Sequence, residues 1–257
     1  MHFQIIFLIS SLLLLTACPS SSTSNGGSSS SSRLVQFIGV DISGSFKRHR
    51  KDALRFTARY IYAHLHGLGK AKVPKALFVG SIGGARPNEP KTFYPIEVFK
   101  YKNVKQIERK LMQIFPRATN PMTDYNAFFN QIKAYAQQHK LTMKPISIVL
   151  LTDGIPDTKT KGKHDYCSFN LKPLELLSNN ITVRVLYTSA GTGLKWQQHV
   201  PRTRVRVWTQ DANVMKMWKS PDIMQKGKKL AKQDRFLDWL ANNVDFKPPK
   251  KKVICKS

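Results

Sequence analysis

Acidic residues are scarce in this chain, which has 15 Asp and Glu against 42 Lys and Arg and a formal net charge of +27. Cysteine is also rare: there are three, without Cys-x-x-Cys or Cys/His metal spacing, which argues against a zinc site. Apolar residues still make up 41% of the chain, enough for a packed core, so disorder throughout is excluded. We therefore expect a folded, strongly basic protein that attracts polyanions.

Charged side chains are missing from residues 1–32. An apolar run over residues 3–15 is too short for a membrane span but typical of a signal-peptide core. It ends in Leu15-Thr16-Ala17-Cys18, which resembles a bacterial lipobox, and the resemblance implies cleavage before Cys18 and acylation of that cysteine. Because His2 is present but no Lys or Arg precedes the run, an uncleaved anchor or a misassigned start is the alternative.

The composition of the residues after Cys18 predicts how the rest of the chain is divided. Nine of the fourteen residues in 19–32 are serine, which is typical of a flexible tether. We predict a signal peptide (1–17), an acylated cysteine with its tether (18–33), one domain (34–246) and a basic tail (247–257). The expected location is the cell envelope, lipid-anchored to a bacterial membrane on its extracytoplasmic side, which is the outer membrane or periplasm if the cell is Gram-negative.

Apolar runs alternate with amphipathic segments along the domain. Strands are predicted at 34–42, 75–82, 93–101 (an edge), 146–151, 181–187 and 204–208. Helices are predicted at 47–66, 104–114, 125–132, 171–178, 211–218 and 222–242, and the glycines of 191–193 are predicted to form a turn. This alternation indicates an α/β fold, with a doubly wound, mostly parallel central sheet and helices on both faces.

Two of the most apolar strands end in carboxylates. Asp41 follows the first strand in Asp41-Ile42-Ser43-Gly44-Ser45, and Asp153 follows 146–151 in Thr152-Asp153-Gly154. This grouping resembles the von Willebrand factor A (vWA) domain, whose metal-ion-dependent adhesion site uses Asp-x-Ser-x-Ser, a Thr from mid-chain and a later Asp. The resemblance spans residues 34–244 and implies a Rossmann-like vWA fold.

The mid-chain threonine has two candidates. Thr123 precedes a helix and is followed four residues later by Ala127, as in the family, although Pro121-Met122 replaces the family's usual preceding Gly. Thr119 is the second candidate.

The resemblance implies a site for Mg²⁺ or Mn²⁺. Asp41, Ser43, Ser45, Thr123 and Asp153 would supply the hard oxygen ligands that such ions prefer. One coordination position would stay open for a carboxylate of an acidic protein partner, so we expect a docking site and not an enzyme. The plainer alternative is that Ser43 or Ser45 caps the following helix and that Asp153-Gly154 forms an ordinary turn.

Motifs of competing enzyme classes are missing. Ser43 stands where haloacid-dehalogenase-like phosphatases have their second Asp, and no Gly-x-Ser-x-Gly elbow follows a strand. The glycine-rich stretches 80–84 and 191–193 lack the Lys-Ser/Thr of a P-loop. A metal-dependent enzyme is therefore the third hypothesis, after the two binding functions.

The second binding hypothesis rests on the positive charge. Lys47, Arg48, Arg50 and Lys51 form a basic rim beside the predicted metal, which would favour an acidic partner. Alternatively, the basic surface binds an anionic envelope polymer, phospholipid head groups or nucleic acid, or is simply solvated.

The remaining cysteines leave one question open. In an oxidising compartment Cys167 and Cys255 could pair and hold the basic tail, which is otherwise expected to be loose. The sequence does not determine whether they do.

Overall fold

The computed structural model describes residues 33–82, 92–116 and 122–255. The predicted signal peptide, Cys18, the tether and Thr119 lie outside these residues. None of the helices in the described part of the chain combines the length and apolar character needed to cross a membrane.

A six-stranded sheet forms the centre of the domain, in the order β3-β2-β1-β4-β7-β8. All neighbouring strands are parallel except β2 and β3. The strands are β1 (Val35–Val40), β2 (Ala76–Ser81), β3 (Tyr94–Pro95), β4 (Ile146–Leu151), β7 (Ile181–Thr188) and β8 (Arg206–Asp211). β1, β4 and β7 are buried along their whole length, are mostly apolar and occupy the middle of the sheet. Their buried polar residues are Gln36, Ser147, Thr182, Arg184 and Thr188. The predicted doubly wound sheet is confirmed.

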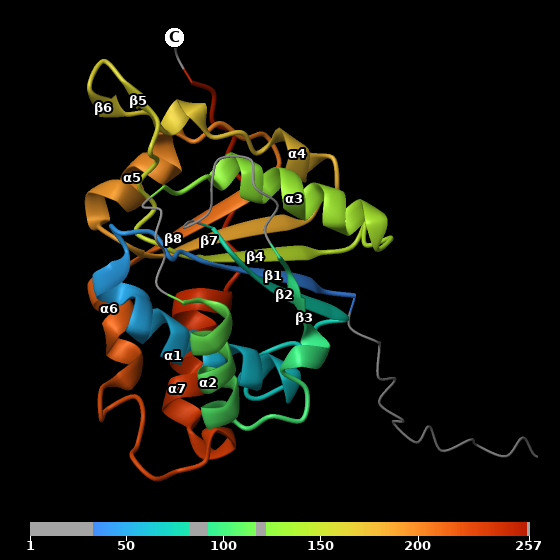
Figure 1. The fold of residues 1–257 in the computed structure, drawn as a ribbon, viewed down its shortest axis with the longest axis vertical. Helices are drawn as coiled ribbons and strands as arrows, with labels where there is room; N and C mark the ends of the chain where they lie inside the picture. Colours follow the sequence, from blue (N-terminus) through green and yellow to red (C-terminus); the bar gives the residue numbers. More distant parts are fainter. Residues whose placement is uncertain (1–32, 83–91, 117–121, 256–257) are drawn as a thin grey trace, which may run out of the picture. The chain divides into compact units, whose positions relative to one another are not determined.

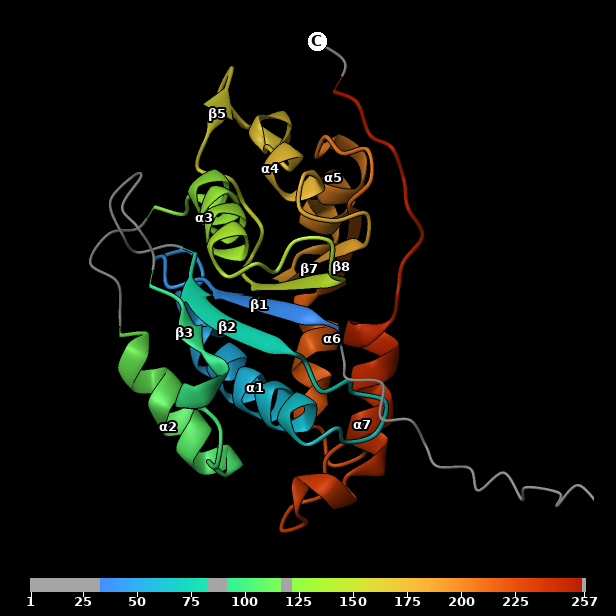
Figure 2. The ribbon, with the colours of Figure 1, turned by 90° about the vertical axis from the view of Figure 1, so that its right-hand side faces the viewer.

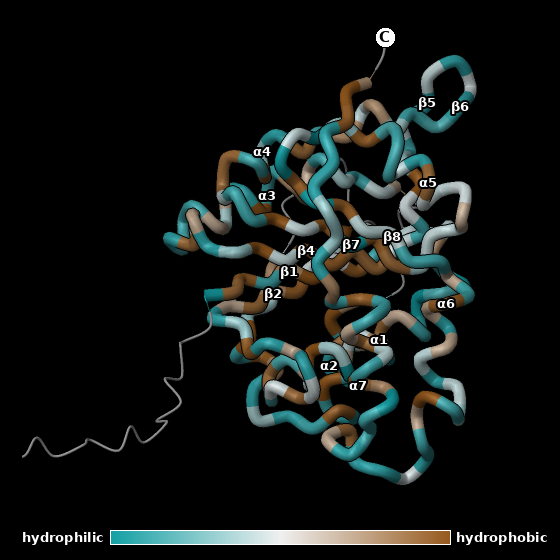
Figure 3. The backbone as a smooth tube through the Cα atoms, turned by 180° about the vertical axis from the view of Figure 1, so that it is seen from behind, coloured by the Kyte–Doolittle hydropathy of each residue, from teal (hydrophilic) through white to brown (hydrophobic). Residues whose placement is uncertain are grey.

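Helices cover both faces of the sheet (Figures 1 and 2). One face carries α1 (Lys47–Leu65), α2 (Val104–Ile114), α6 (Ala212–Lys216) and α7 (Asp234–Leu240). The other carries α3 (Tyr125–Gln138), α4 (Lys172–Glu175) and α5 (Ala190–His199). Seen from behind, hydrophobic residues concentrate along the strands, while much of the helical periphery is hydrophilic (Figure 3).

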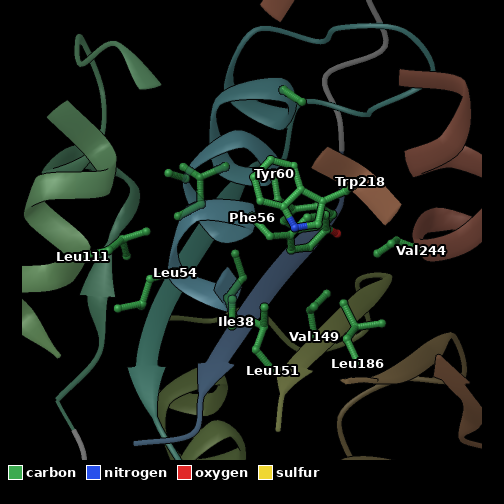
Figure 4. Close-up of a cluster of buried hydrophobic side chains, with 14 of the residues drawn as sticks. Ile38, Leu54, Phe56, Tyr60, Leu111, Val149, Leu151, Leu186, Trp218 and Val244 are labelled. Carbon is green, nitrogen blue, oxygen red and sulfur yellow. The ribbon is translucent and has the colours of Figure 1, made fainter. Parts of the chain in front are cut away.

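Each face has its own hydrophobic core. In the core beneath α1, side chains of neighbouring strands lie near aromatic side chains of the helical layer (Figure 4). The labelled strand residues are Ile38, Val149, Leu151 and Leu186, and the labelled aromatic residues are Phe56, Tyr60 and Trp218. The second core packs Phe128 and Phe129 of α3 and Trp196 of α5 against the opposite face.

Shorter elements complete the domain. They are the 3₁₀ turns η1 (Ile96–Val98), η2 (Tyr166–Ser168), η3 (Met217–Lys219) and η4 (Leu230–Lys232), the π-helical turn η5 (Ala241–Asp245), and the hairpin of β5 (Lys159–Thr160) and β6 (Lys163–His164).

Three predicted elements are at most half as long in the structure as predicted. The edge strand predicted at 93–101 has only two residues in β3 before η1 begins. The helix predicted at 171–178 is reduced to the four residues of α4. The helix predicted at 222–242 is α-helical only over α7, and Gly227, with a φ of +84°, interrupts the segment before it.

The glycines predicted to form a turn lie instead at the start of α5. Ser189 caps this helix, because its hydroxyl accepts a hydrogen bond from the backbone N–H of Thr192 at 3.1 Å. Gly193 faces β8, where an added Cβ would lie 2.9 Å from Oγ1 of Thr209. The glycine therefore lets α5 pack closely on the sheet edge.

The C-terminal tail is held at two points. A disulfide joins Cys167 and Cys255, which are 88 residues apart. Two backbone hydrogen bonds, of 3.0 and 2.8 Å, link Arg202 and Val253 in an isolated antiparallel bridge. The tail up to Cys255 is therefore tied to the domain and is not a loose extension.

Candidate metal centre

The two predicted carboxylates lie at neighbouring strand ends. Val40 of β1 pairs with Leu151 of β4, so the next residues, Asp41 and Thr152, leave the sheet side by side. The chain continues from β1 to β2 on one side and from β4 to β7 on the other. Such a switch in winding direction leaves a crevice at the carboxyl ends of the strands, where ligands of doubly wound sheets bind.

Asp41 is fully buried in this crevice. Its Oδ2 accepts a hydrogen bond from Oγ1 of Thr152 at 2.6 Å, and its Oδ1 accepts one from the backbone N–H of Ser43 at 2.8 Å. Burial raises the pKa of Asp41 to about 6, although the hydrogen bonds from Thr152 and Ser43 oppose this shift. The nearby charge of Asp153 also raises the pKa.

Thr152 connects three segments of the chain. Its single hydroxyl proton goes to Asp41, so Tyr125 at the start of α3 must donate the 2.6 Å hydrogen bond between their hydroxyls. The backbone N–H of Gly154 donates to the same Thr152 oxygen at 3.1 Å. Thr152 is thereby saturated and holds Asp41 in place. The sequence analysis included Thr152 in the motif after β4 but gave it no role, and it did not identify Tyr125 as part of the site.

Ser43 and Ser45 bring hydroxyl groups to the same end of the sheet. Their Oγ atoms lie 3.2 Å apart, with Ser43 buried and Ser45 exposed. Neither serine caps α1, which begins after Phe46 without any side-chain cap. The capping alternative is therefore wrong for these serines.

Asp153 lies mostly buried beside Asp41. Its Oδ1 accepts a hydrogen bond from the backbone N–H of Ile155 at 3.1 Å, which is the turn expected of an Asp-Gly pair. Gly154 adopts a φ of +75°, and an added Cβ there would lie 2.9 Å from the indole nitrogen of Trp196. The turn thus requires glycine at this position.

Thr123, the predicted mid-chain ligand, lines a separate cavity of about 270 Å³, whose lining contains none of the other four predicted ligands. It is 7% exposed and precedes Asp124, whose Oδ1 accepts a 2.8 Å hydrogen bond from the backbone N–H of Ala127 and so caps α3. The backbone N–H of Thr123 donates to the carboxylate of Asp157. Through Tyr125, two residues further on, this segment is hydrogen-bonded to Thr152 and from there to Asp41.

The carboxylates of the site lack basic partners. Among the described residues, neither Asp41 nor Asp153 forms an ion pair with Lys, Arg or His, although the protein carries 42 Lys and Arg. The same part of the chain contains no group of three or more His, Cys, Asp and Glu suited to a metal. A cation at this site would therefore depend on the hydroxyls beside the two carboxylates.

The four residues of the predicted basic rim have different surroundings in the structure. Arg48 and Asp153 line a cavity of about 300 Å³ together with Lys216. The guanidinium of Arg50 instead donates a hydrogen bond to the backbone carbonyl of Phe115, at the end of α2. Lys47 and Lys51 are exposed on α1. Of the predicted rim, Arg48 is thus the residue that shares a cavity with a candidate metal ligand.

His49 completes the wall of this cavity. Its Nε2 accepts a hydrogen bond from Nε of Arg48 at 3.0 Å. Burial lowers the pKa of His49, and the charges of Arg48 and Lys216 lower it further, which favours the neutral imidazole needed to accept this bond.

The chain matches no protein-family model and no curated protein sequence. Among solved structures it is similar to proximal thread matrix protein 1 from the mussel byssus, with 14% identity and a TM-score of 0.43 over 72% of this chain and 46% of that one. The open pilus adhesin SpaC from Lactobacillus rhamnosus GG shows 15% identity and a TM-score of 0.45 over 81% of this chain and 30% of that one.

A third similar structure is the SpRpn10 VWA domain, with 12% identity and a TM-score of 0.42 over 82% of this chain and 95% of that one. The chain spans less than half the length of the mussel protein and less than a third of the adhesin. These likenesses assign no activity, metal or partner to this chain.

Proposed function

We propose that the domain is a vWA-like docking module that binds Mg²⁺ or Mn²⁺ between the ends of β1 and β4 and takes a carboxylate of an acidic protein partner on the ion. The observation that carries this proposal is the pair of buried carboxylates, Asp41 and Asp153, which have no basic partner among the described residues of a strongly basic protein. Burying such charges is costly unless a cation compensates them.

The donor set fits a hard dication. Ser43, Ser45 and Thr123 would offer neutral hydroxyl oxygens, while Asp41 and Asp153 would balance the charge. The ion would act as a Lewis acid that attracts an incoming carboxylate. The protein's own part is to hold Asp41 through Thr152 and Ser43. We propose a binding site and not a reaction centre.

Calorimetric titration of the purified protein with MnCl₂ tests the metal site. We expect one Mn²⁺ per chain and a loss of affinity of at least about tenfold in Ser43→Ala and Asp153→Asn, which each remove a proposed oxygen or charge. Asp222→Asn is the matched control, because it removes one exposed carboxylate elsewhere and should bind normally. Absence of binding at millimolar Mn²⁺ would refute the proposal.

The partner is tested separately, with a glutamate-rich peptide as the probe. Capture that is lost when EDTA is added supports docking through the metal. Capture that survives EDTA but disappears at high salt would instead favour the basic surface.

We further propose that acylation of Cys18 anchors the module in the cell envelope. The lipobox-like sequence supports this proposal, and the segment lies outside the described residues. Wild-type protein labelled in cells with radioactive palmitate should carry the label, and Cys18→Ser should not. Equal labelling of both would refute the assignment.

Polyanion binding is the second candidate function. It is favoured by one specific observation, a groove lined by six cationic side chains on the face of the domain that carries α1 and α2.

A further inference from the structure

A cationic groove lies between α1, α2 and the segment 217–226. It has a volume of about 750 Å³. Figure 2 shows α1 and α2 side by side on one face of the sheet, with the segment that contains η3 following α6 on the same face. The cationic side chains that line the groove are Arg55 and Arg59 of α1, Lys105 and Arg109 of α2, and Lys219 and Lys226 of the third segment. These six residues define what we call the α1–α2 groove.

Acidic side chains only partly neutralise the α1–α2 groove. Glu108 is the one carboxylate among the described residues of its lining, and it pairs with Arg55 at 3.1 Å and with Arg59 at 3.4 Å. Asp52 pairs with Lys219 at 2.6 Å. Lys105, Arg109 and Lys226 form no ion pair within the described residues. They are also exposed, so at least three cations are available to an incoming anion.

The positive charges repeat along the two helices. Arg55 and Arg59 are four residues apart, and so are Lys105 and Arg109. Four residues correspond to about 6 Å along a helix axis, which is similar to the separation of neighbouring phosphates in an extended strand. Arginine also binds phosphate through two parallel hydrogen bonds, which a lysine cannot do.

The described residues of the groove offer no aromatic surface on which a base could stack. Trp218 is the one aromatic residue among them, and it is 3% exposed. The guanidinium of Arg59 lies 4.8 Å from the centre of its ring, and its indole N–H donates to Asp52 at 3.2 Å. Proteins that bind single-stranded nucleic acid without sequence preference rely on exposed aromatic side chains as well as charge. The described lining of the α1–α2 groove offers charge and the side chains of Met112 and Met224, but no exposed aromatic ring.

We infer that the α1–α2 groove binds the backbone of a flexible phosphodiester polymer that carries no bases, such as a sugar- or polyol-phosphate chain, through its phosphates. The cations come from two helices and a third segment around one recess, so several of them can contact successive phosphates of a chain that lies in it. This binding needs no metal, since none of the proposed metal ligands lines the groove.

Binding of fluorescent probes of equal length to the full-length protein in EDTA tests the inference. The probes are an abasic deoxyribose-phosphate oligomer, oligo(dT) and oligoglutamate. We expect the abasic oligomer and oligo(dT) to bind equally within about twofold, and oligoglutamate at least about tenfold more weakly. A tenfold preference for oligo(dT), or equal binding of oligoglutamate, would overturn the assignment of the polymer.

Charge-matched variants locate the site. Replacing Lys105, Arg109 and Lys226 by Gln should weaken binding of the abasic oligomer and reduce the slope of log K against log salt by about 2, since each phosphate contact on a single strand contributes about 0.7. Replacing Lys159, Lys161 and Lys163 of the β5–β6 hairpin by Gln removes the same charge from another exposed surface. Equal losses in both triple variants would overturn the groove as the site.

A final variant separates binding from folding. Glu108→Gln removes the carboxylate that occupies Arg55 and Arg59, so it should strengthen binding of the abasic oligomer. Damage to the fold cannot produce such a gain. Unchanged or weaker binding in Glu108→Gln, with normal circular dichroism, would count against the inference.

Discussion

The hydroxyl of Thr152, at the end of β4, donates a 2.6 Å hydrogen bond to the buried carboxylate of Asp41, at the end of β1. This bond joins two segments separated by 111 residues, and Tyr125 adds a third segment through its own 2.6 Å bond to Thr152. The hydroxyl groups of Tyr125 and Thr152 thus support Asp41, the more deeply buried of the two carboxylates at the candidate metal centre. The first two predictions concern these hydrogen bonds.

Asp41→Asn should gain stability relative to wild type as the pH rises, in the metal-free protein. The pKa of Asp41 is raised to about 6 from its ordinary value of 3.8, so the folded state holds this proton more tightly than the unfolded chain. The associated stability of the wild type is therefore present below pH 3.8 and is lost as the pH rises through 6, by about 3 kcal/mol in total. Asparagine carries no charge to bury and avoids this pH-dependent loss. Its amide has one oxygen where Asp41 uses two to accept from Thr152 and Ser43, which adds a cost that does not depend on pH.

Urea denaturation in EDTA, at several pH values between 4 and 7, measures the effect. The free-energy difference between Asp41→Asn and wild type should grow with pH, whereas added Mn²⁺ should stabilise the wild type alone. A difference that stays constant across this range would contradict the prediction.

Tyr125→Phe should weaken metal binding without removing a ligand. The variant loses the hydroxyl that donates to Thr152, which costs about 1 kcal/mol of stability and loosens the support of Asp41. We expect the dissociation constant for Mn²⁺ to rise by roughly three- to tenfold, and calorimetry measures it.

Tyr60→Phe is the control for Tyr125→Phe. It also removes a buried hydroxyl, one that donates to Asp245 at 2.8 Å. Tyr60 lies in the core beneath α1 and not at the metal centre, so its variant should lose stability but keep the Mn²⁺ affinity. Equal effects of both variants on affinity would mean that general destabilisation is the cause.

Arg48→Glu should change cation and partner binding in opposite directions. Arg48 shares a cavity with Asp153, so a negative charge there attracts the cation and repels an acidic partner. At low salt we expect Mn²⁺ to bind about threefold more tightly and a glutamate-rich peptide several-fold more weakly. Lys51→Glu makes the same charge change outside the cavity lining and should have smaller effects on both. Parallel changes in both affinities would contradict the assigned role of Arg48.

Reduction of the Cys167–Cys255 disulfide should release the tail. On the chain-entropy model, a closed loop of this length contributes about 4–5 kcal/mol to stability. We expect dithiothreitol, or the double replacement of both cysteines by Ser, to lower the urea midpoint and to speed tryptic cleavage at Lys250–Lys252. Cleavage at the same rate with and without the disulfide would show that the Arg202–Val253 bridge alone holds the tail.

Local patterns in the sequence were sufficient to predict the central sheet. The strands β1, β4 and β7 are mostly apolar segments of six to eight residues, because both faces of a central parallel strand are buried. The carboxylates at two of their ends could be identified for the same reason, since they mark where such a run leaves the core. Predictions failed where the spacing of apolar residues is compatible with more than one type of secondary structure. The segment 222–242 has helical spacing but forms 3₁₀, α and π turns in succession.

Tertiary structure alone decided which groups meet. The order of the strands places Asp41 beside Thr152, and the position of α3 brings Tyr125 to the same point, although no spacing in the sequence encodes either contact. Packing likewise turned the Arg50 side chain toward Phe115, joined the two cysteines, and formed the α1–α2 groove from three separate segments. The residue pattern of a segment indicates which of its side chains face solvent and which face the core. The contacts named here depend instead on how distant segments pack against one another.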